Sequence, residues 1–452
     1  MSEISRRFAN YAITQSVFSD NAYDAAKTFI LDSLGVGIAG CKAPFNDAVF
    51  KTAMSWGAGD DVHLWGRGLK APTTTAAFLN GFQIHSMEYD CVHEPAVVHP
   101  MAAIFSAVSA EAERRKGVTG SELIEAVIVA GDCAVEMGVA VSTPLKFFRP
   151  ATASLFGATL GVARLRGFDE ATTMSAMGCA LAQCAGVMQA HVEGKPTLPV
   201  QIAGAARAAI VACDLAQAGL YGPESSLEGP FGYFNMFEDE SDAQGGAERL
   251  GKVHRISEVS WKPFPTGRAA QGAIVLVQKL MKQGVTFENL EELVLSAPPI
   301  IPRLVNRPIV ENMTANYARL CFPYLAPIVL MRGTVGLGDF TNADLHSPEI
   351  LAASKKIKIE TNHISDPAEF VPQTMSARLK NGEEKMAKID KLFGSPDDPL
   401  SREQHIDKFR NCLLFGLGNA KAKPTADSLI TLVDNLEHSD DCRKIFSLAS
   451  GL

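Results

Sequence analysis

The stretch that decides the fold class is Thr119-Gly-Ser-Glu122-Leu-Ile-Glu-Ala-Val-Ile-Val-Ala-Gly-Asp-Cys-Ala-Val-Glu-Met-Gly-Val-Ala-Val141. Thr119 and Glu122 have the spacing of a capping box, in which each side chain bonds the other residue's backbone N–H at a helix start. The long apolar run after them is interrupted only by single acids. The stretch therefore predicts a helix.

Helical signals recur on both sides of this stretch. Ser19 can cap a helix, and Asp169 can cap another over 171–188, while 200–218 predicts a further one. Apolar side chains after Ser19 follow a period close to 3.6 residues: Ala22, Ala26, Phe29, Ile30 and Leu34. Small residues are dense in this half, which favours close approach of helices in a compact bundle.

The pattern changes near residue 255. Asn381-Gly382 between two alternating segments is the strongest short signal for a hairpin. Segments that resemble strands are 257–261, 292–296, 355–360 and the two arms of 376–389. The region 258–395 is therefore expected to be an α+β unit.

Helix returns after residue 394. Ser401 and Gln404 form a second capping box, and Thr425 can cap the last helix. The expected fold class is mainly α. A large helical domain would be built from both termini, residues 1–257 and 396–452, with 258–395 as a smaller α+β lid domain. The interface between the two domains would be a natural cleft.

Composition excludes several classes of function. The net charge is −8, with 42 basic and 50 acidic residues, so no nucleic-acid partner is expected. No apolar h-region follows the first residues and no charge-free apolar stretch reaches 18 residues, so we expect a cytoplasmic protein without a membrane partner. Nine cysteines without a C-x-x-C pair argue against a disulfide framework, a zinc site or an iron–sulfur cluster.

The first candidate site lies between Asn80 and Pro100. Three histidines and three carboxylates fall within 15 residues: His85, Glu88, Asp90, His93, Glu94 and His99. Their spacing is poor for a metal on a helix, because Pro95 and Pro100 interrupt it. A solvated loop with capping side chains is one reading. We favour an acid/base site.

Cations beside turns form the other candidates. Arg149 precedes Pro150 at a predicted helix start, where the helix dipole and free N–H groups attract an anion. Lys262 and Arg268 flank a Pro/Gly-rich turn that could hold a rigid loop over an anion, and Lys195 lies near another turn. Exposed cations at ordinary turns are the alternative reading.

The order of these blocks resembles the MmgE/PrpD family, which includes 2-methylcitrate dehydratase, cis-aconitate decarboxylase and iminodisuccinate epimerase. The resemblance covers nearly the whole chain. The matching blocks are Ile30–Val36, Asn80–Asp90, His99-Pro100, Pro150–Gly157, Gly204–Arg207, Leu227–Phe234, Lys262–Pro265, Asp397–Ser401 and Lys408–Arg410. It implies a homodimer that needs no cofactor and no metal and acts on a small polycarboxylate.

The resemblance also implies roles for residues. Glu88-Tyr-Asp90 matches the family's acidic stretch and His99 its histidine before proline, whereas Arg149 stands in place of a second histidine. The expected catalytic residues are His99, Glu88, Asp90 and Lys195. The expected substrate-binding residues are Arg149, Lys262, Arg268, His93 and Gln201.

The reaction class follows from the same resemblance. Proton transfer next to a carboxylate builds charge on its oxygens, which fixed cations stabilise and a positioned histidine assists. We expect a dehydratase-like or decarboxylase-like lyase. An epimerase or isomerase is the alternative, and a catalytically inactive protein that keeps the fold is a third possibility.

Overall fold

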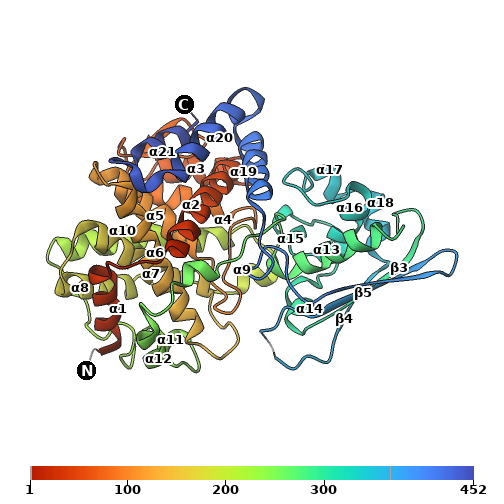
Figure 1. The fold of residues 1–452 in the computed structure, drawn as a ribbon, viewed down its shortest axis with the longest axis horizontal. Helices are drawn as coiled ribbons and strands as arrows, with labels where there is room; N and C mark the ends of the chain where they lie inside the picture. Colours follow the sequence, from red (N-terminus) through yellow and green to blue (C-terminus); the bar gives the residue numbers. More distant parts are fainter. Residues whose placement is uncertain (1–2, 367, 452) are drawn as a thin grey trace.

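The structure, a computed structural model, describes residues 3–366 and 368–451 and consists mostly of helices (Figure 1). The first part of the chain contains α1 (Glu3–Thr14), α2 (Asp20–Gly40), α3 (Asn46–Met54), β1 (Val62–Leu64), β2 (Leu69–Ala71), α4 (Thr73–His85), α5 (Pro100–Arg115), α6 (Gly120–Val139), α7 (Arg149–Arg166), α8 (Glu170–Leu181), α9 (Gln189–Glu193), α10 (Leu198–Gln217), α11 (Tyr233–Phe237), α12 (Ala243–Arg249) and the 3-10 turn η1 (Arg255–Glu258). This arrangement confirms the predicted mainly α fold class.

A smaller α+β part and a helical tail follow. The α+β part contains α13 (Arg268–Met281), β3 (Leu290–Ala297), α14 (Ile300–Val305), α15 (Ala315–Ala318), α16 (Phe322–Arg332), α17 (Asn342–Leu345), α18 (Pro348–Ser354), β4 (Ile357–Thr361), β5 (Gln373–Leu379) and β6 (Glu384–Ile389). The tail contains α19 (Arg402–Leu417), α20 (Asn419–Asp434), η2 (Leu436–His438) and α21 (Arg443–Ala449). In Figure 1 the tail lies against the first helices, at the opposite end of the chain.

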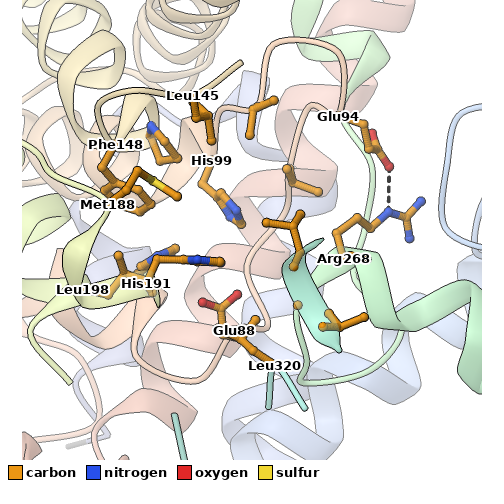
Figure 2. A pocket seen from close by; sticks show the side chains of 18 of the residues that line it. Glu88, Glu94, His99, Leu145, Phe148, Met188, His191, Leu198, Arg268 and Leu320 are labelled. Atoms are coloured by element: carbon orange, nitrogen blue, oxygen red, sulfur yellow. Dashed lines mark hydrogen bonds and ion pairs between the residues drawn. The ribbon is translucent and has the colours of Figure 1, made fainter. Parts of the chain in front are cut away.

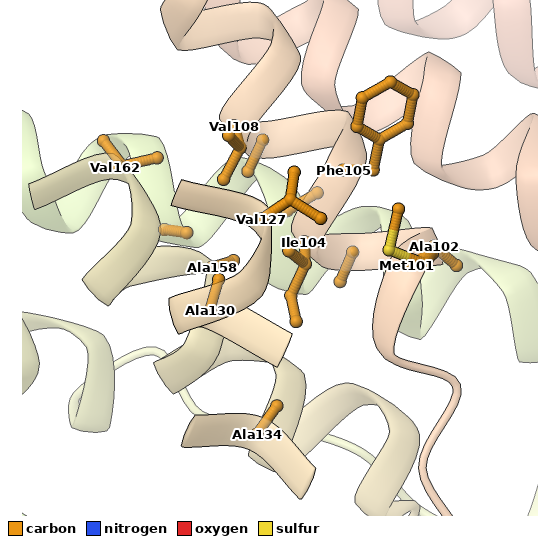
Figure 3. Packing of buried hydrophobic residues seen from close by; sticks show 14 of the residues in the cluster. Met101, Ala102, Ile104, Phe105, Val108, Val127, Ala130, Ala134, Ala158 and Val162 are labelled. Carbon is orange, nitrogen blue, oxygen red and sulfur yellow. The ribbon is translucent and has the colours of Figure 1, made fainter. Parts of the chain in front are cut away.

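Helix α6 shows why the first half folds as a bundle. Its capping box forms as predicted, since Thr119 Oγ1 accepts from the Glu122 N–H at 3.2 Å and Glu122 accepts from the Thr119 N–H at 2.8 Å. Helices α5, α6 and α7 then interlock through small and aliphatic side chains (Figure 3). At Gly157 a Cβ would lie 2.4 Å from the carbonyl oxygen of Ala130, so only glycine permits this approach of α7 to α6.

The hydrophobic core has two main clusters. One contains buried residues from Phe8 to Val259 and from Phe409 to Ala449, and the other runs from Phe264 to Leu392. We use the names helical domain and lid domain for the parts that hold these clusters. The tail joins the helical domain because α19 packs on α2, where the ring of Phe409 occupies the space that a Cβ at Gly35 would need.

The lid sheet has the strand order β4-β3-β5-β6, with β3 and β4 parallel and the other pairs antiparallel. The hairpin at Asn381-Gly382 is confirmed: Gly382 has φ of 86° and the Asn381 side chain accepts from the Glu383 N–H at 3.0 Å. Helix α13, the first element of the lid domain, packs on β5, β6 and α16.

Three predicted boundaries are wrong. The strand at 257–261 is absent, because 255–258 forms the turn η1 and only Ser260 makes a bridge, to Val92. Helix α8 ends at Leu181, because residues further on turn back to pair with the segment before α7. Thr425 does not cap the last long helix but lies inside α20. This helix begins after Gly418, where a φ of 76° turns the chain between α19 and α20.

Within the described ranges, α10 alone has the length and apolar composition that could cross a membrane. It carries Arg207 and Asp214, and 61% of its most apolar window is buried inside the structure. It contacts α4, α7, α8 and α5, and a core helix of a globular protein meets the same criteria.

Candidate active site

A partly enclosed cavity of about 90 Å³ lies between the two domains. Ionisable side chains on its wall come from the end of α4, the loop before α5, α9 and the start of α13 (Figure 2): His85, Glu88, Glu94, His99, His191 and Arg268. Apolar residues such as Phe148, Met188 and Leu320 complete the wall. The cavity can therefore hold a small molecule against several acid/base groups.

Asp90 binds two histidines at the back of this cavity. Its Oδ2 atom lies 2.9 Å from Nδ1 of His85, the last residue of α4, and 3.1 Å from Nδ1 of His99, the residue that precedes α5. The two imidazole rings are 4.9 Å apart and nearly perpendicular. A carboxylate only accepts hydrogen bonds, so both Nδ1 atoms donate to Asp90, and neither Nε2 atom is used in these contacts.

The three groups differ in protonation. Burial opposes ionisation of Asp90, but the charges of His85, His99 and Lys262 outweigh it and hold the Asp90 pKa well below its usual range. Burial likewise opposes protonation of His85, but Asp90 outweighs it and raises the His85 pKa. Burial lowers the pKa of His99, and Lys262 lowers it further. His85 is therefore the more readily protonated member of the pair, and His99 is the one that stays neutral at pH 7.

Glu88 and Lys262 form a buried ion pair beside the histidines. Lys262 Nζ lies 2.9 Å from Glu88 Oε2 and 3.9 Å from Asp90 Oδ1, and the lysine is fully buried. Although burial raises the Glu88 pKa, Lys262 and the two histidines lower it to about 2. Glu88 is thus ionised at neutral pH. Lys262, which was predicted to bind a substrate carboxylate, pairs with Glu88 in the structure.

The backbone that carries the two acids is fixed from both domains. Arg319 of the lid donates to the carbonyl oxygen of Met87 at 3.0 Å, and Lys408 of α19 donates to that of Tyr89 at 3.0 Å. Glu88 between them has φ of 53°, a left-handed conformation that costs energy for a residue other than glycine. The two cations stabilise this strained conformation and so position the Glu88 carboxylate in the cavity.

His191 is a cavity residue that the sequence analysis did not select. It lies in α9, and its ring points into the cavity from the side opposite Arg268 in Figure 2. Burial lowers its pKa to about 4, with a further contribution from Arg307, so it is neutral at pH 7. The only sequence signal was its place beside the turn of Lys195.

A wider chamber of about 310 Å³ adjoins the cavity. The two share lining residues: Val97, Leu145, Met188, His191 and Leu304. Arg303 and Arg307 line the chamber, and neither was predicted from the sequence. Both lie in the segment 302–308, which has a proline at each end and in this respect resembles the Lys262–Arg268 turn. This pattern could have identified them from the sequence.

Arg149 is not free to bind substrate, which corrects the sequence prediction. Its Nε and Nη2 atoms donate to the two carboxylate oxygens of Glu238 at 2.8 and 2.9 Å, and Nη1 donates to the carbonyl oxygen of Ala96 at 2.9 Å. Both side chains are buried. The charge that was expected to attract a carboxylate is already neutralised within the helical domain.

Arg268 reaches the wall of the cavity but is also paired. Its Nε donates to Glu94 at 2.6 Å, the contact drawn in Figure 2, and Nη1 donates to the carbonyl oxygen of Phe393 at 2.8 Å. Its Nη2 is buried without a partner in the described ranges. The structure thus brings Arg268 near the site, with most of its charge balanced by Glu94.

Three other predicted site residues lie outside the cavity wall. His93 donates from Nε2 to Glu258 at 3.2 Å and accepts from the Ala96 N–H at 3.1 Å, so it shapes the loop before His99. Gln201 donates to the carbonyl oxygen of Val187 at 3.1 Å, and Lys195 is exposed. Neither lines the cavity or the chamber, because both side chains turn to the surface of the helical domain.

Arg149 gives a prediction about stability. Replacing it by Met should destabilise the protein by about 3–5 kcal/mol, because Glu238 would stay buried without its partner. Adding Glu238→Gln should recover part of the loss. Urea unfolding of both variants and the wild type measures this. If the Arg149→Met variant had wild-type stability and a raised KM, Arg149 would be a substrate-binding residue.

His85, Asp90 and His99 could also be read as metal ligands, because one donor atom of each lies within 4.8 Å of the others. The hydrogen bonds argue for a different use of these atoms. Both Nδ1 atoms already lie at hydrogen-bond distance from one Asp90 oxygen, and the Lys262 ammonium lies 3.9 Å from the other. A cation at this point would face a second positive charge, so we favour the hydrogen-bonded arrangement.

Fold and site together define a two-domain, mainly helical protein with a buried histidine–carboxylate cluster in its interdomain cavity. The chain belongs to the MmgE/PrpD family: the family's N-terminal domain matches residues 6–245 and its C-terminal domain matches residues 264–431. The second match continues into α20, so the family's division by sequence differs from the division of the hydrophobic core.

Similar proteins are cis-aconitate decarboxylases. The chain is 27% identical to the enzyme of Mus musculus over 451 residues, which is 96% of this chain and 90% of the relative. It is 26% identical to that of Homo sapiens over 450 residues, 96% and 91% of the two chains. It is 28% identical to that of Aspergillus terreus over 468 residues, 94% and 91% of the two chains. These relatives are lyases, so the comparisons support a lyase-type function in the family.

Proposed function

We propose that the protein is a lyase that acts on a small di- or tricarboxylate by proton transfer at a carbon next to a carboxylate. One observation carries the proposal. Neutral His99 lines the cavity and is oriented by one oxygen of Asp90, while the buried Lys262 ammonium lies 3.9 Å from the other oxygen of Asp90. The decarboxylase names of the relatives agree with this reaction class.

The reaction needs charge stabilisation and a proton carrier. When a C–H or C–CO₂ bond next to a carboxylate breaks, the electron pair moves toward the carboxylate oxygens. Cations fixed near those oxygens stabilise that charge, and each such group is worth about 10²–10³ in rate. In a decarboxylation, the carbon that loses CO₂ then takes one proton. In a dehydration, a base removes the proton and an acid protonates the departing hydroxyl.

The cluster supplies both kinds of group. His99 has a free Nε2 lone pair and serves as the base, while protonated His85 offers an Nε2–H that is buried without a partner in the described ranges. Lys262 keeps Glu88 and Asp90 ionised and offsets their charge next to an anionic substrate. Every step is thus assigned to side chains of the chain itself, and we propose that no cofactor or metal takes part.

A turnover assay tests the proposal. Purified protein is given citrate, 2-methylcitrate, cis-aconitate and iminodisuccinate, with and without EDTA, and products are identified by mass. We expect one of the acids to lose water or CO₂ at a rate that EDTA does not change. Activity that disappears with EDTA and returns with a divalent metal would favour the metal reading of His85, Asp90 and His99. No turnover of any acid would contradict the lyase proposal.

An isomerase remains a second candidate because of His191. His191 and His99 are both neutral, come from separate segments and face the same cavity (Figure 2). For epimerisation, one neutral histidine would take the proton from one face of the carbon, and the other, after taking up a proton from solvent, would deliver it to the opposite face. An unchanged substrate mass, together with solvent deuterium at the reacting carbon, would identify this reaction.

The protonation states predict a bell-shaped pH profile. His99 must be neutral, and its pKa is lowered, so kcat/KM should fall only below the usual histidine value of about 6.5. His85 must be protonated, and its pKa is raised, so activity should also fall as pH rises beyond that value. Initial rates measured from pH 4 to pH 10 check this. A single limb with a midpoint near 6.5 would contradict the assignment.

We also propose that the protein is cytoplasmic and that it is a homodimer, and the homodimer rests on the family resemblance. Gel filtration with light scattering should then give a mass of twice 48.4 kDa at micromolar concentration. A clean monomer under these conditions would contradict the dimer without affecting the proposed chemistry.

A further inference from the structure

We propose that the chamber beside the catalytic cavity is an anion subsite, in which Arg303 and Arg307 bind a substrate carboxylate remote from the reacting carbon. This inference rests on the proposed function and assigns a binding place to the second carboxylate of its substrate. It requires an acid with at least two carboxylates, one placed at the histidine cluster and the other in the chamber. A monocarboxylate would leave the chamber empty.

The wall of the chamber carries positive charge. The residues that line it include Arg149, Arg303 and Arg307 but no Asp or Glu. Glu238 neutralises Arg149. Arg303 and Arg307 form no ion pair with any residue in 3–366 or 368–451, so the chamber keeps two uncompensated positive charges. An arginine pair of this kind suits a carboxylate, because each guanidinium can donate two parallel hydrogen bonds.

Two buried polar groups at the chamber lack a hydrogen-bond partner among the described residues. Arg307 is 9% exposed, and its Nη2 donates to the carbonyl oxygen of His191 at 2.6 Å. Its Nη1 is buried with no partner in the described part of the chain, and so is the Thr143 hydroxyl, which also lines the chamber. Buried groups without partners cost free energy, and a bound carboxylate is the kind of acceptor that both lack.

Arg307 is held rigidly where it lines the chamber. Its guanidinium lies 5.2 Å from the centre of the Tyr317 ring. The absence of a side chain at Gly194 leaves the space for it, because a Cβ there would lie 2.9 Å from Nη1. Gly194 has φ of 64°, which also favours glycine. A fixed cation loses little freedom when a ligand binds, which favours affinity.

The chamber is continuous with the catalytic cavity. His191 lines both spaces, and its backbone carbonyl accepts the hydrogen bond from Arg307. Leu304, between the two arginines in sequence, also lines both spaces. A single molecule can therefore extend from His99 into the chamber. The lid supplies both arginines and the helical domain supplies the histidines, so such a substrate would bridge the two domains.

Binding of an unreactive ligand tests the subsite separately from catalysis. Tricarballylate, a saturated tricarboxylate, and propionate are titrated into the wild type and into Arg303→Gln and Arg307→Gln by calorimetry. We expect each substitution to weaken tricarballylate binding about ten- to hundredfold, the value of one charge-assisted hydrogen bond. Propionate binding should change little. Arg378→Gln, which removes an exposed lid arginine on β5, is the matched control and should bind like the wild type.

The outcomes separate the two proposals. Wild-type affinity for tricarballylate in the folded Arg303→Gln and Arg307→Gln variants would overturn the subsite, whatever the enzyme turns over. Failure of the wild type to bind tricarballylate at millimolar concentration would overturn it too. Arginine-dependent binding without turnover of any acid would support the subsite and contradict the lyase proposal. If Arg307→Gln fails to fold, the exposed Arg303 still decides the result.

Discussion

Replacing His99 by Gln is expected to lower kcat/KM by about 10²–10⁴-fold, the usual contribution of a positioned acid or base. The Gln amide can still donate to Asp90, so the hydrogen bond that orients residue 99 is kept. What is lost is the Nε2 lone pair, which only a neutral imidazole offers. The loss should appear in kcat more than in KM, because proton transfer belongs to the transition state.

The control for this variant is His346→Gln. His346 is exposed in the lid, where its ring bonds the backbone oxygen of Asn342 at 2.8 Å, so its replacement should leave kcat/KM unchanged. Steady-state kinetics and thermal unfolding of both variants complete the measurement. If His99→Gln stays within twofold of the wild type, His99 is not the base, and His191 becomes the candidate for that role.

The second large effect is expected for Lys262→Met. This change leaves Glu88 buried without its cation, which should cost about 3–5 kcal/mol of stability. It also removes a positive charge beside the reacting groups, which should lower kcat about 10²–10³-fold. A second change, Glu88→Gln, should restore much of the stability but not the activity, because it removes the stranded charge without replacing the cation.

The pH dependence of stability is an independent test of the ion pair between Glu88 and Lys262. The folded pKa of Glu88, about 2, lies below its unfolded value of about 4.3. The pair therefore stabilises the fold fully above pH 4.3, and this contribution disappears as the pH falls toward 2. Lys262→Met should lose that contribution, which urea unfolding between pH 3 and pH 7 would measure.

The control here is Lys358→Met, which breaks an exposed contact with Glu292 on the lid sheet. An exposed pair contributes about 0–1 kcal/mol, so stability and activity should stay near wild type. Equal effects of Lys262→Met and Lys358→Met would show that the buried pair has no special role in the site.

Much of the fold was predictable because its signals are local. The capping boxes at Thr119 and Ser401 and the turn at Asn381-Gly382 form as predicted, since each depends on atoms only a few residues apart. The strand predicted at 257–261 does not form, because strands depend on contacts that are distant along the chain. A strand needs a partner, and only Ser260 finds one, in Val92 far back along the chain.

The candidate site, like the fold, was predictable from the sequence only in part. The sequence by itself determined that histidines and carboxylates gather between His85 and His99, whereas Lys262 was expected only to bind a substrate carboxylate. Only the tertiary structure decided what those groups can do. Arg149 and Glu238 neutralise each other across 89 residues, whereas Arg303 and Arg307 line the chamber beside the cavity only because the lid packs against the helical domain. The physical reason is that charge state and availability depend on burial and on ionic partners, and both come from residues far apart along the chain.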